Sequence, residues 1–428
     1  MAFPDPSSGQ TGESAQKSAT IIRSAILFVN FFLIITALYQ LKPSSRSLIL
    51  DVLPAAHLPY VWILSAGVLF ATVYTYQWLL RRLPRLYVVL GTAALFMAAL
   101  AAFRLALFQP GRVAPVAFYV FVDMVGVVLV EQFWSLANSL YSTRDGKSWY
   151  GLIGTGGLLG GGLGSALAAA LIHYTPLQTP DLLLVAAAIL GVIFALTALM
   201  GWLRIYTENP AAPVSVLHQD GRWQWHGFPA NRYLLLIAGA LLMAQLVSPM
   251  VEFQFMKIVE VSFPEREART ATLGVFFSVL SGFSIVVNLV VTPLILRWLG
   301  VLAGLLVQPA LLALSTWGFA LHPGFHTAAI MKISDRGLSY SLTRAAKELL
   351  YIPVDTLVMY QAKAWIDMFG YRTFKMVGAV LILLLTQWTG LAPRYLPLTW
   401  VIVLLCGVWG VLLVVLYRDY QALAAEAG

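Results

Sequence analysis

The sequence contains very little cysteine and very little charge, and each shortage excludes a class of protein. The 428-residue chain has one cysteine, Cys406, so it can form neither an internal disulfide nor a cysteine-based metal site. Charged residues make up 11% of the chain, against about 25% in a typical soluble domain, and hydrophobic residues make up 60%. This composition argues against a water-soluble enzyme and predicts an integral membrane protein.

Histidine is also scarce, and no arrangement of residues points to catalysis. His322 and His326 are separated by Pro323 and Gly324, which favours a loop over a metal site on one helix face. The Gly-rich stretch 154–165 follows no strand and lacks the GK[ST] of a phosphate-binding loop, so it predicts close packing of membrane helices. We therefore expect no catalytic residue, no metal and no cofactor.

Long apolar stretches dominate what the sequence does contain. A helix needs roughly 20 apolar residues to cross a bilayer, and about twelve stretches meet this requirement. They predict an all-α membrane protein with about 12 transmembrane helices, near residues 20–41, 59–80, 86–108, 113–141, 150–173, 181–203, 231–256, 270–296, 298–321, 325–360, 373–392 and 395–417. The tenth stretch is the weakest because it carries six charges.

The polar interval 204–230 divides these spans into two sets of six. Two six-helix halves joined by a central loop form the major-facilitator architecture, whose substrate site lies between the halves. Lys and Arg are enriched on the side of both termini, which predicts a multi-pass membrane protein with both termini cytoplasmic. The predicted units are a disordered tail 1–19, a half 20–203, a cytoplasmic loop 204–230, a half 231–417 and a tail 418–428.

Two acids interrupt the fourth span. Asp123 and Glu131 are eight residues apart, within about 80° of one another on a helix, and Asn138 follows on nearly the same face. An acid at membrane depth is costly unless it is paired or hydrated. The acids therefore predict either a polar stripe facing a cavity, with a coupling or ion-pairing role and with Asn138 contacting substrate, or a structural pair with a cation of another span.

Three cations interrupt the tenth span. The spacing of Arg336, Arg344 and Lys347 allows one helix face, and Glu348 can pair with Arg344 four residues earlier. Cations that line a membrane cavity suit an anionic substrate, because Arg binds phosphate or carboxylate bidentately and Lys acts as a point charge. The alternative is that these side chains lie near a helix end and extend to the interface.

Two further sets of charges allow two readings each. The charges after the tenth span form either a cytoplasmic gate or ordinary positive-inside anchors: Lys363, Asp367, Arg372 and Lys375. Lys42 and Arg46 follow the first span, where Pro43 interrupts the backbone. They face either the outer side of the substrate path or the lipid headgroups.

Several motifs resemble the bacterial and plastid ATP/ADP translocase family. In YSLTRAAKELLYIPVD, residues 340–355, Lys347, Glu348, Tyr351 and Asp355 match the family's K-E-x-x-Y-I-P-x-D. QAKAWIDMFGYRTFK resembles its continuation, and FWSLAN and WYGLIGTGGLLGG resemble its first-half motifs. The chain departs from the family at Ser339, where the exchangers carry Lys, and at Arg344, where they carry Asp.

The resemblance implies a secondary transporter that works by alternating access and exchanges an anionic, nucleotide or phosphate-bearing solute, with ATP and ADP as candidates. The alternatives are a proton-coupled major-facilitator transporter of another small solute and a membrane scaffold without transport. The expected partners are the small anionic substrate and the lipid bilayer. The net charge of +8 is spread over short loops and predicts no nucleic-acid partner. The sequence does not indicate an oligomeric state.

Overall fold

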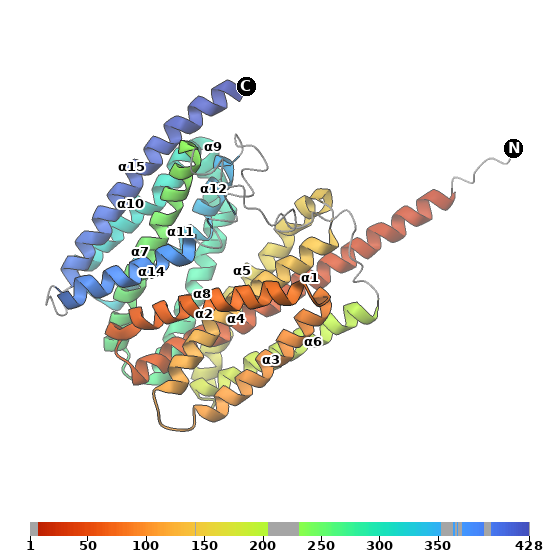
Figure 1. The fold of residues 1–428 in the computed structure, drawn as a ribbon, viewed down its shortest axis with the longest axis horizontal. Coiled ribbons are helices and arrows are strands. Elements are labelled where there is room, and N and C mark those ends of the chain that lie inside the picture. Colours follow the sequence, from red (N-terminus) through yellow and green to blue (C-terminus); the bar gives the residue numbers. More distant parts are fainter. Residues whose placement is uncertain are drawn as a thin grey trace.

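The protein is a bundle of long helices in two groups. The computed structural model describes residues 7–141, 143–203, 231–351, 363, 366, 370–388 and 395–427. Helices α1 to α6 form one group and helices α7 to α15 form the other (Figure 1). The two groups diverge toward the ends of α1 and α15 that carry the chain termini, as Figure 1 shows.

The N-terminal half contains six long helices. They are α1 (Ser7–Val52), α2 (Leu58–Leu80), α3 (Arg85–Ala106), α4 (Val113–Leu140), α5 (Thr143–Tyr174) and α6 (Leu182–Trp202). Short 3-10 turns, Ala55–His57 and Thr179–Asp181, precede α2 and α6. These bounds agree with the apolar stretches of the sequence to within a few residues, except that α1 is longer at both ends and α5 begins at Thr143, before its predicted start at residue 150.

The C-terminal half is less regular. Its elements are α7 (Arg232–Ser262), α8 (Arg266–Val286), a π-helical turn (Val287–Val291), α9 (Thr292–Trp298), α10 (Gly300–Leu321), α11 (Phe325–Ser339), α12 (Leu342–Leu350), α14 (Tyr371–Leu383), a second π-helical turn (Leu384–Trp388) and α15 (Tyr395–Ala427). Within the described residues, ten helical segments are long and apolar enough to cross a membrane. The predicted tenth and eleventh spans, which contain α11, α12 and α14 and lie partly outside the described residues, are not among these ten.

Two expectations about helix limits differ from the structure. Helix α1 begins at Ser7, inside the segment predicted to be a disordered tail, and it continues through Pro43 to Val52. The Ser44 hydroxyl donates to the carbonyl of Gln40 (2.7 Å), one turn before it, and supports the backbone at this point. The tenth span is broken between α11 and α12, because Ser341 leaves helical geometry (φ −119°, ψ −94°).

Glycines on α5 allow α1 to approach closely, as predicted from the Gly-rich stretch. A Cβ atom on Gly160 would lie 2.4 Å from the carbonyl oxygen of Phe32, and one on Gly164 would lie 2.8 Å from the Cα of Thr36. The amide of Gln40 donates to the carbonyl of Gly164 (2.7 Å). Helix α5 also packs against α8, so it joins the two halves through small residues.

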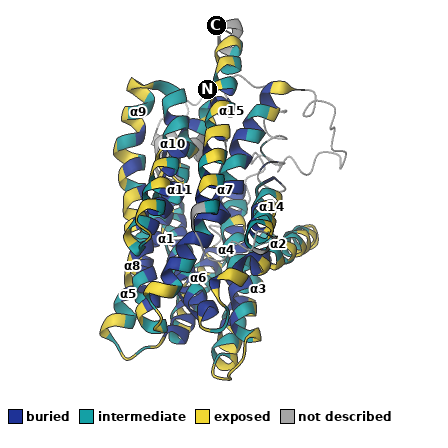
Figure 2. Ribbon diagram, turned by 90° about the vertical axis from the view of Figure 1, so that its left-hand side faces the viewer, coloured by how far each residue is buried: buried dark blue, intermediate teal, exposed yellow. Residues whose placement is uncertain are grey.

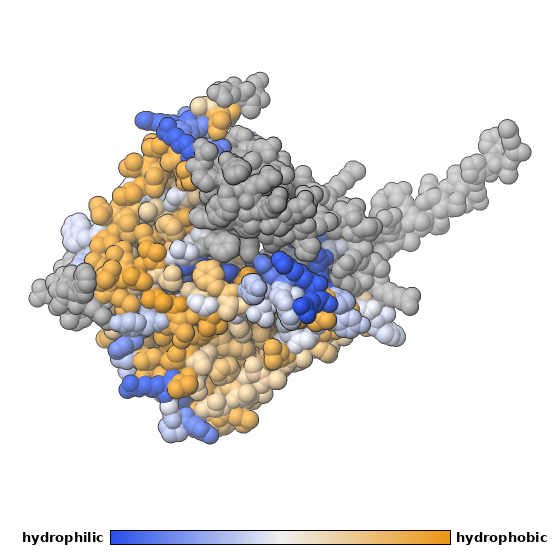
Figure 3. All heavy atoms as spheres, viewed as in Figure 1, coloured by the Kyte–Doolittle hydropathy of each residue, from blue (hydrophilic) through white to orange (hydrophobic). Residues whose placement is uncertain are grey.

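Apolar side chains cover the outside of the bundle as well as its core. Leu95, Leu314 and Leu404 are 63–68% exposed, which is typical of a surface that faces lipid. Buried residues lie along the inner helix faces (Figure 2), while apolar residues cover much of the visible flank and hydrophilic residues gather near helix ends (Figure 3). The protein is a multi-pass membrane protein.

Candidate functional site

A pocket in the C-terminal half brings together the cations of the tenth span. It encloses about 300 Å³ and is walled by α7, α10, α11, α12, α14 and α15. Its polar lining includes Gln308, Arg336, Thr343, Arg344, Lys347 and Tyr371, and its apolar lining includes Leu241, Trp409 and Leu413. A few polar groups on an apolar wall are typical of a small-molecule site.

The three predicted cations reach this pocket in a way that the sequence did not indicate. A continuous helix was expected to carry Arg336, Arg344 and Lys347 on one face, but the break at Ser341 divides them between α11 and α12. All three nevertheless line the same pocket, because α12 resumes alongside α10. The break therefore shapes the pocket.

Each cation is held differently. The Arg336 side chain is 25% exposed, and its Nε lies 3.5 Å from Asp335. Lys347 donates to the hydroxyl of Tyr371 (3.0 Å) and lies 5.3 Å from the centre of that ring. Arg344 is exposed and makes no ion pair within the described part of the chain. Arg336 and Arg344 thus have capacity for a further anionic partner.

Gln308 holds the pocket wall together with its side-chain amide. Its Nε2 donates to the hydroxyl of Ser339 (2.7 Å) and to the carbonyl of Asp335 (3.0 Å), and its Oε1 accepts from Thr343 (2.7 Å). These bonds join α10 to both sides of the helix break. The sequence analysis missed Gln308, although a buried glutamine in an apolar span is a visible signal.

The predicted gate residues are only partly brought together. Lys363 donates to Glu348 (2.6 Å), so Glu348 pairs with Lys363 and not with Arg344 as expected from helix spacing. Arg372 lies over the ring of Phe70 on α2 (6.0 Å) and experiences the charge of Glu131 on α4. Lys375 is half-buried on α14. Asp367 lies outside the described residues.

The polar residues of α4 do not line the pocket. Asp123 is half-buried near the middle of the helix, and its Oδ2 atom is buried without a hydrogen-bond partner among the described residues. Its charge acts on Lys42 and Arg46. Glu131 and Asn138 are exposed toward the end of α4. Substrate contact by Asn138 remains a prediction.

Lys42 and Arg46 lie inside the protein and not among headgroups. Because α1 continues to Val52, they lie about 15 Å and 9 Å before its end. Lys42 lies over the ring of Tyr39 (4.2 Å), and Arg46 pairs with Glu252 of α7 (3.1 Å). Both side chains therefore face the interior between the halves.

Arg46 begins a set of linked ion pairs that the sequence analysis largely missed. Glu252 also pairs with Lys332 (2.8 Å), which pairs with Asp335 (3.1 Å), which lies 3.5 Å from Arg336. We call these five residues the ion-pair chain. The missed signal was the single acid in the apolar stretch 231–256, which has no other charged residue between Arg232 and Lys257.

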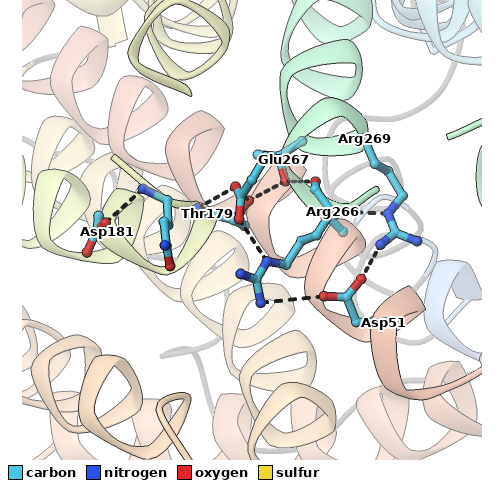
Figure 4. Close-up of polar contacts among 9 residues, drawn as sticks. Asp51, Thr179, Asp181, Arg266, Glu267 and Arg269 are labelled. Atoms are coloured by element: carbon cyan, nitrogen blue, oxygen red, sulfur yellow. Dashed lines mark hydrogen bonds and ion pairs between the residues drawn. The ribbon is translucent and has the colours of Figure 1, made fainter. Parts of the chain in front are cut away.

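A second ionic cluster joins the halves where α1 ends and α8 begins. Arg269 pairs with Asp51, and Arg266 lies 3.6 Å from Asp51 and 2.9 Å from Glu267. Glu267 accepts from the backbone N–H (2.7 Å) and the hydroxyl (2.5 Å) of Thr179. Figure 4 shows these contacts converging from α1, the turn before α6, and α8. We call these five residues the interhalf cluster.

Comparison with known proteins identifies relatives among carriers. Residues 325–420 match the family model described as TLC ATP/ADP transporter, which covers the pocket helices α11, α12 and α14. The chain is 24% identical over 304 residues to ADP,ATP carrier protein 1 of Chlamydia muridarum, and 24% identical over 301 residues to that of Chlamydia trachomatis serovar D. Each match covers 62% of this chain and 57% of the relative, so the chain spans little more than half of the relatives' length. These relatives are carriers and not enzymes.

Solved transporter structures share the whole fold. A bacterial homologue of the iron transporter ferroportin in an inward-facing state superposes with a TM-score of 0.64 at 14% identity, over 92% of this chain and 98% of that one. The POT family transporter PepTSo superposes with a TM-score of 0.64 at 12% identity, over 92% of this chain and 98% of that one. The nucleoside transporter NupG superposes with a TM-score of 0.62 at 12% identity, over 94% of this chain and 99% of that one. The chain thus has the fold of these transporters, and the resemblance of its motifs to the ATP/ADP translocase family is confirmed over residues 325–420.

Proposed function

We propose that this protein is a secondary transporter that exchanges an anionic, nucleotide-type solute by alternating access. The observation that carries the proposal is the convergence of Arg336, Arg344 and Lys347 on one pocket from two separate helices. Arg336 has one carboxylate at 3.5 Å and Arg344 makes no ion pair among the described residues, and a cation inside an apolar protein is costly unless it has an anionic partner. A phosphate-bearing substrate supplies that partner.

The chemistry of the pocket suits a nucleotide. Guanidinium groups bind phosphate oxygens in pairs, and the ammonium of Lys347 adds a point charge beside them. Tyr340, Tyr371 and Trp409 supply aromatic surface on the same wall, against which a base can stack. The names of the chlamydial relatives, ADP,ATP carrier proteins, support ATP and ADP as the first solutes to test.

The distribution of Lys and Arg supports a particular orientation. We place the protein in the bacterial inner membrane with both termini cytoplasmic, as the Lys and Arg distribution favours. The pocket then lies toward the cytoplasmic ends of α7 and α10, and the interhalf cluster closes the opposite side. This conformation is the inward-facing state of the transport cycle.

The test is transport in reconstituted proteoliposomes. Vesicles loaded with ADP should take up labelled ATP, and uptake should fall to background when internal ADP is omitted. Uptake that does not depend on internal ADP, or a complete lack of uptake, would reject exchange. Lys347→Ala should abolish uptake of the true substrate, while Lys257→Ala, at the other end of α7 beside Phe253, should retain it. Wild-type transport by Lys347→Ala would reject the site.

A proton-coupled transporter of another solute is the second candidate, and one observation favours it. The Oδ2 atom of Asp123 is buried without a hydrogen-bond partner among the described residues, and acids within transmembrane segments often belong to ion or proton pathways. An imposed pH gradient should then drive uptake without internal substrate. Asp123→Asn should abolish this uptake while preserving exchange between equal internal and external substrate.

A further inference from the structure

Helix α2 lies at the edge of the bundle and keeps one face exposed (Figure 2). Its other faces pack against α4 and against α14 of the C-terminal half. The exposed face carries Leu64, Ala71, Tyr74 and Trp78, which recur at intervals of seven, three and four residues and so share one side of the helix. Leu64 is 53% exposed, Tyr74 is 75% exposed and Trp78 is 47% exposed. This face is apolar and aromatic, as a surface that contacts lipid should be.

Two arginines lie where this face ends. Arg81 and Arg82 follow Trp78 by three and four residues, and Arg81 keeps helical backbone angles (φ −76°, ψ −16°). Both side chains are exposed, and the guanidinium of Arg82 lies over the Trp78 ring, 4.5 Å from its centre. Neither arginine makes an ion pair within the described part of the chain. Figure 3 shows hydrophilic residues gathered at this end of α2, beside the apolar flank.

The sequence around these arginines contains no acid that could balance them. Between Asp51 and Asp123 the chain has no aspartate and no glutamate. The ends of α7 and α15 differ in this respect, because Arg232 pairs there with Asp419 (3.3 Å). Among the described residues, the end of α2 therefore carries positive charge without a matching carboxylate, next to an apolar face.

The order of these features matches the order of the parts of an anionic phospholipid. Along α2 an apolar residue, Ala71, is followed by the aromatic rings of Tyr74 and Trp78 and then by the arginines. Ala71 lies about 15 Å before Arg81 along the helix axis, which is about half the thickness of the hydrocarbon core of a bilayer. Tyrosine and tryptophan favour the level of the headgroups, and arginines beyond them attract anionic lipids.

We propose that this face of α2 is a specific binding site for one anionic phospholipid. Arg81 and Arg82 bind the phosphate, Trp78 lies beside the glycerol region, and an acyl chain runs along Tyr74 and Ala71. Anchoring by positive charge alone needs cations near a helix end but no apolar and aromatic face that continues from them. The inference goes beyond the proposed function and does not depend on which solute is transported.

Native mass spectrometry of the detergent-solubilised protein counts bound lipids and tests this site. The probes are phosphatidylglycerol, which is anionic, and phosphatidylcholine, which has no net charge. We expect one phosphatidylglycerol to bind about tenfold more tightly than phosphatidylcholine, and we expect Arg81→Gln/Arg82→Gln to remove this preference. Equal affinities for the two lipids in the parent protein, or an unchanged preference in the double variant, would overturn the proposal.

Two matched double variants separate this site from general effects of charge and folding. Arg232→Gln/Arg418→Gln removes the same charge from the ends of α7 and α15, where Asp419 lies, and should keep the preference. Arg81→Lys/Arg82→Lys keeps the charge and should keep most of the binding. If Arg232→Gln/Arg418→Gln loses the preference as well, the attraction is nonspecific and the site is rejected. A complete loss in the lysine variant would reject phosphate binding through charge at this position.

Inorganic phosphate distinguishes a lipid from a free anion as the occupant. It can approach Arg81 and Arg82, but it cannot cover Tyr74 and Trp78, so it should bind more weakly than the lipid. Phosphate at a concentration equal to that of phosphatidylglycerol should leave the number of bound lipids unchanged. Displacement of the lipid under these conditions would assign the arginines to a free anion and would overturn the lipid site.

Discussion

The interhalf cluster and the pocket use the same kinds of residues for opposite purposes. In the cluster, Arg269 is 2% exposed and paired with Asp51, and Arg266 contacts two carboxylates. In the pocket, Arg336 has one distant carboxylate and Arg344 has none among the described residues. Cations that are matched with acids from the opposite half close an interface. Cations that outnumber their acids leave a site for an external anion.

The two regions also differ in where their partners lie along the chain. The cluster joins Asp51 to Arg266 and Arg269, and Thr179 to Glu267, across the boundary between the halves. All the described residues that line the pocket belong to the C-terminal half. Changes to the cluster should therefore alter conformation and stability, and changes to the pocket should alter ligand binding.

The largest effect is expected from reversing a charge in the cluster. Arg269→Glu places a second carboxylate against Asp51 in a site that is 2% exposed. Breaking a buried ion pair by removing one partner costs about 3–5 kcal/mol. We expect a melting temperature several degrees lower, measured by thermal aggregation of the detergent-solubilised protein.

The partner substitution supplies the control for this reversal. Asp51→Arg in the same protein restores opposite charges across the interface and should recover part of the lost melting temperature. Equal melting temperatures for Arg269→Glu and the parent would show that the cluster does not hold the halves together.

A smaller effect is expected from a substitution in the pocket, and it concerns the affinity for ligand instead of the melting temperature. Arg344→Gln removes a guanidinium that can bind phosphate oxygens, a loss of about 1.5–3 kcal/mol or roughly tenfold to a hundredfold in affinity. Because Arg344 makes no ion pair in the described part of the chain, the melting temperature without ligand should not fall. Titration of ATP with the melting temperature as readout measures both properties.

Arg297 on α9 is the matched control for Arg344. It is exposed, it lies away from the pocket, and Arg297→Gln should leave the ATP titration unchanged. Equal losses of affinity in Arg297→Gln and Arg344→Gln would indicate a general effect of net charge and would contradict a specific site.

The sequence was sufficient for the helices because their apolar stretches are long. Six predicted spans of the N-terminal half correspond to α1 to α6, and the Gly-rich stretch correctly predicted close packing of α5 on α1. The expected helix limits were wrong at Pro43, where the helix continues, and at Ser341, where it breaks. A proline can remain inside a membrane helix when neighbouring groups support the backbone, and a break without proline or glycine has no clear signal in the sequence.

The pocket was predictable in composition but not in geometry. Arg336, Arg344 and Lys347 were identified because charge is scarce in an apolar span. The ion pairs around these cations were not predicted, because Glu348 contacts Lys363, fifteen residues later, instead of Arg344 one turn earlier. Contacts between distant segments, such as Arg46 with Glu252, depend on how the halves pack, and one sequence does not contain that information.

The smallest effect is expected from a single hydroxyl in the cluster. Thr179 is fully buried, and its hydroxyl donates to Glu267 and lies 2.7 Å from that of Thr270. Thr179→Val keeps the shape and removes this donor, which should cost about 1 kcal/mol.

Thr316 is equally buried, but its hydroxyl has no partner among the described residues. Thr316→Val should therefore leave the melting temperature unchanged or raise it, because it removes an unsatisfied polar group. A loss of stability in Thr179→Val alone would show that the contact between the halves, and not the burial of a hydroxyl, stabilises the closed cluster. Equal losses of stability in Thr179→Val and Thr316→Val would contradict a special role for the contact between the halves.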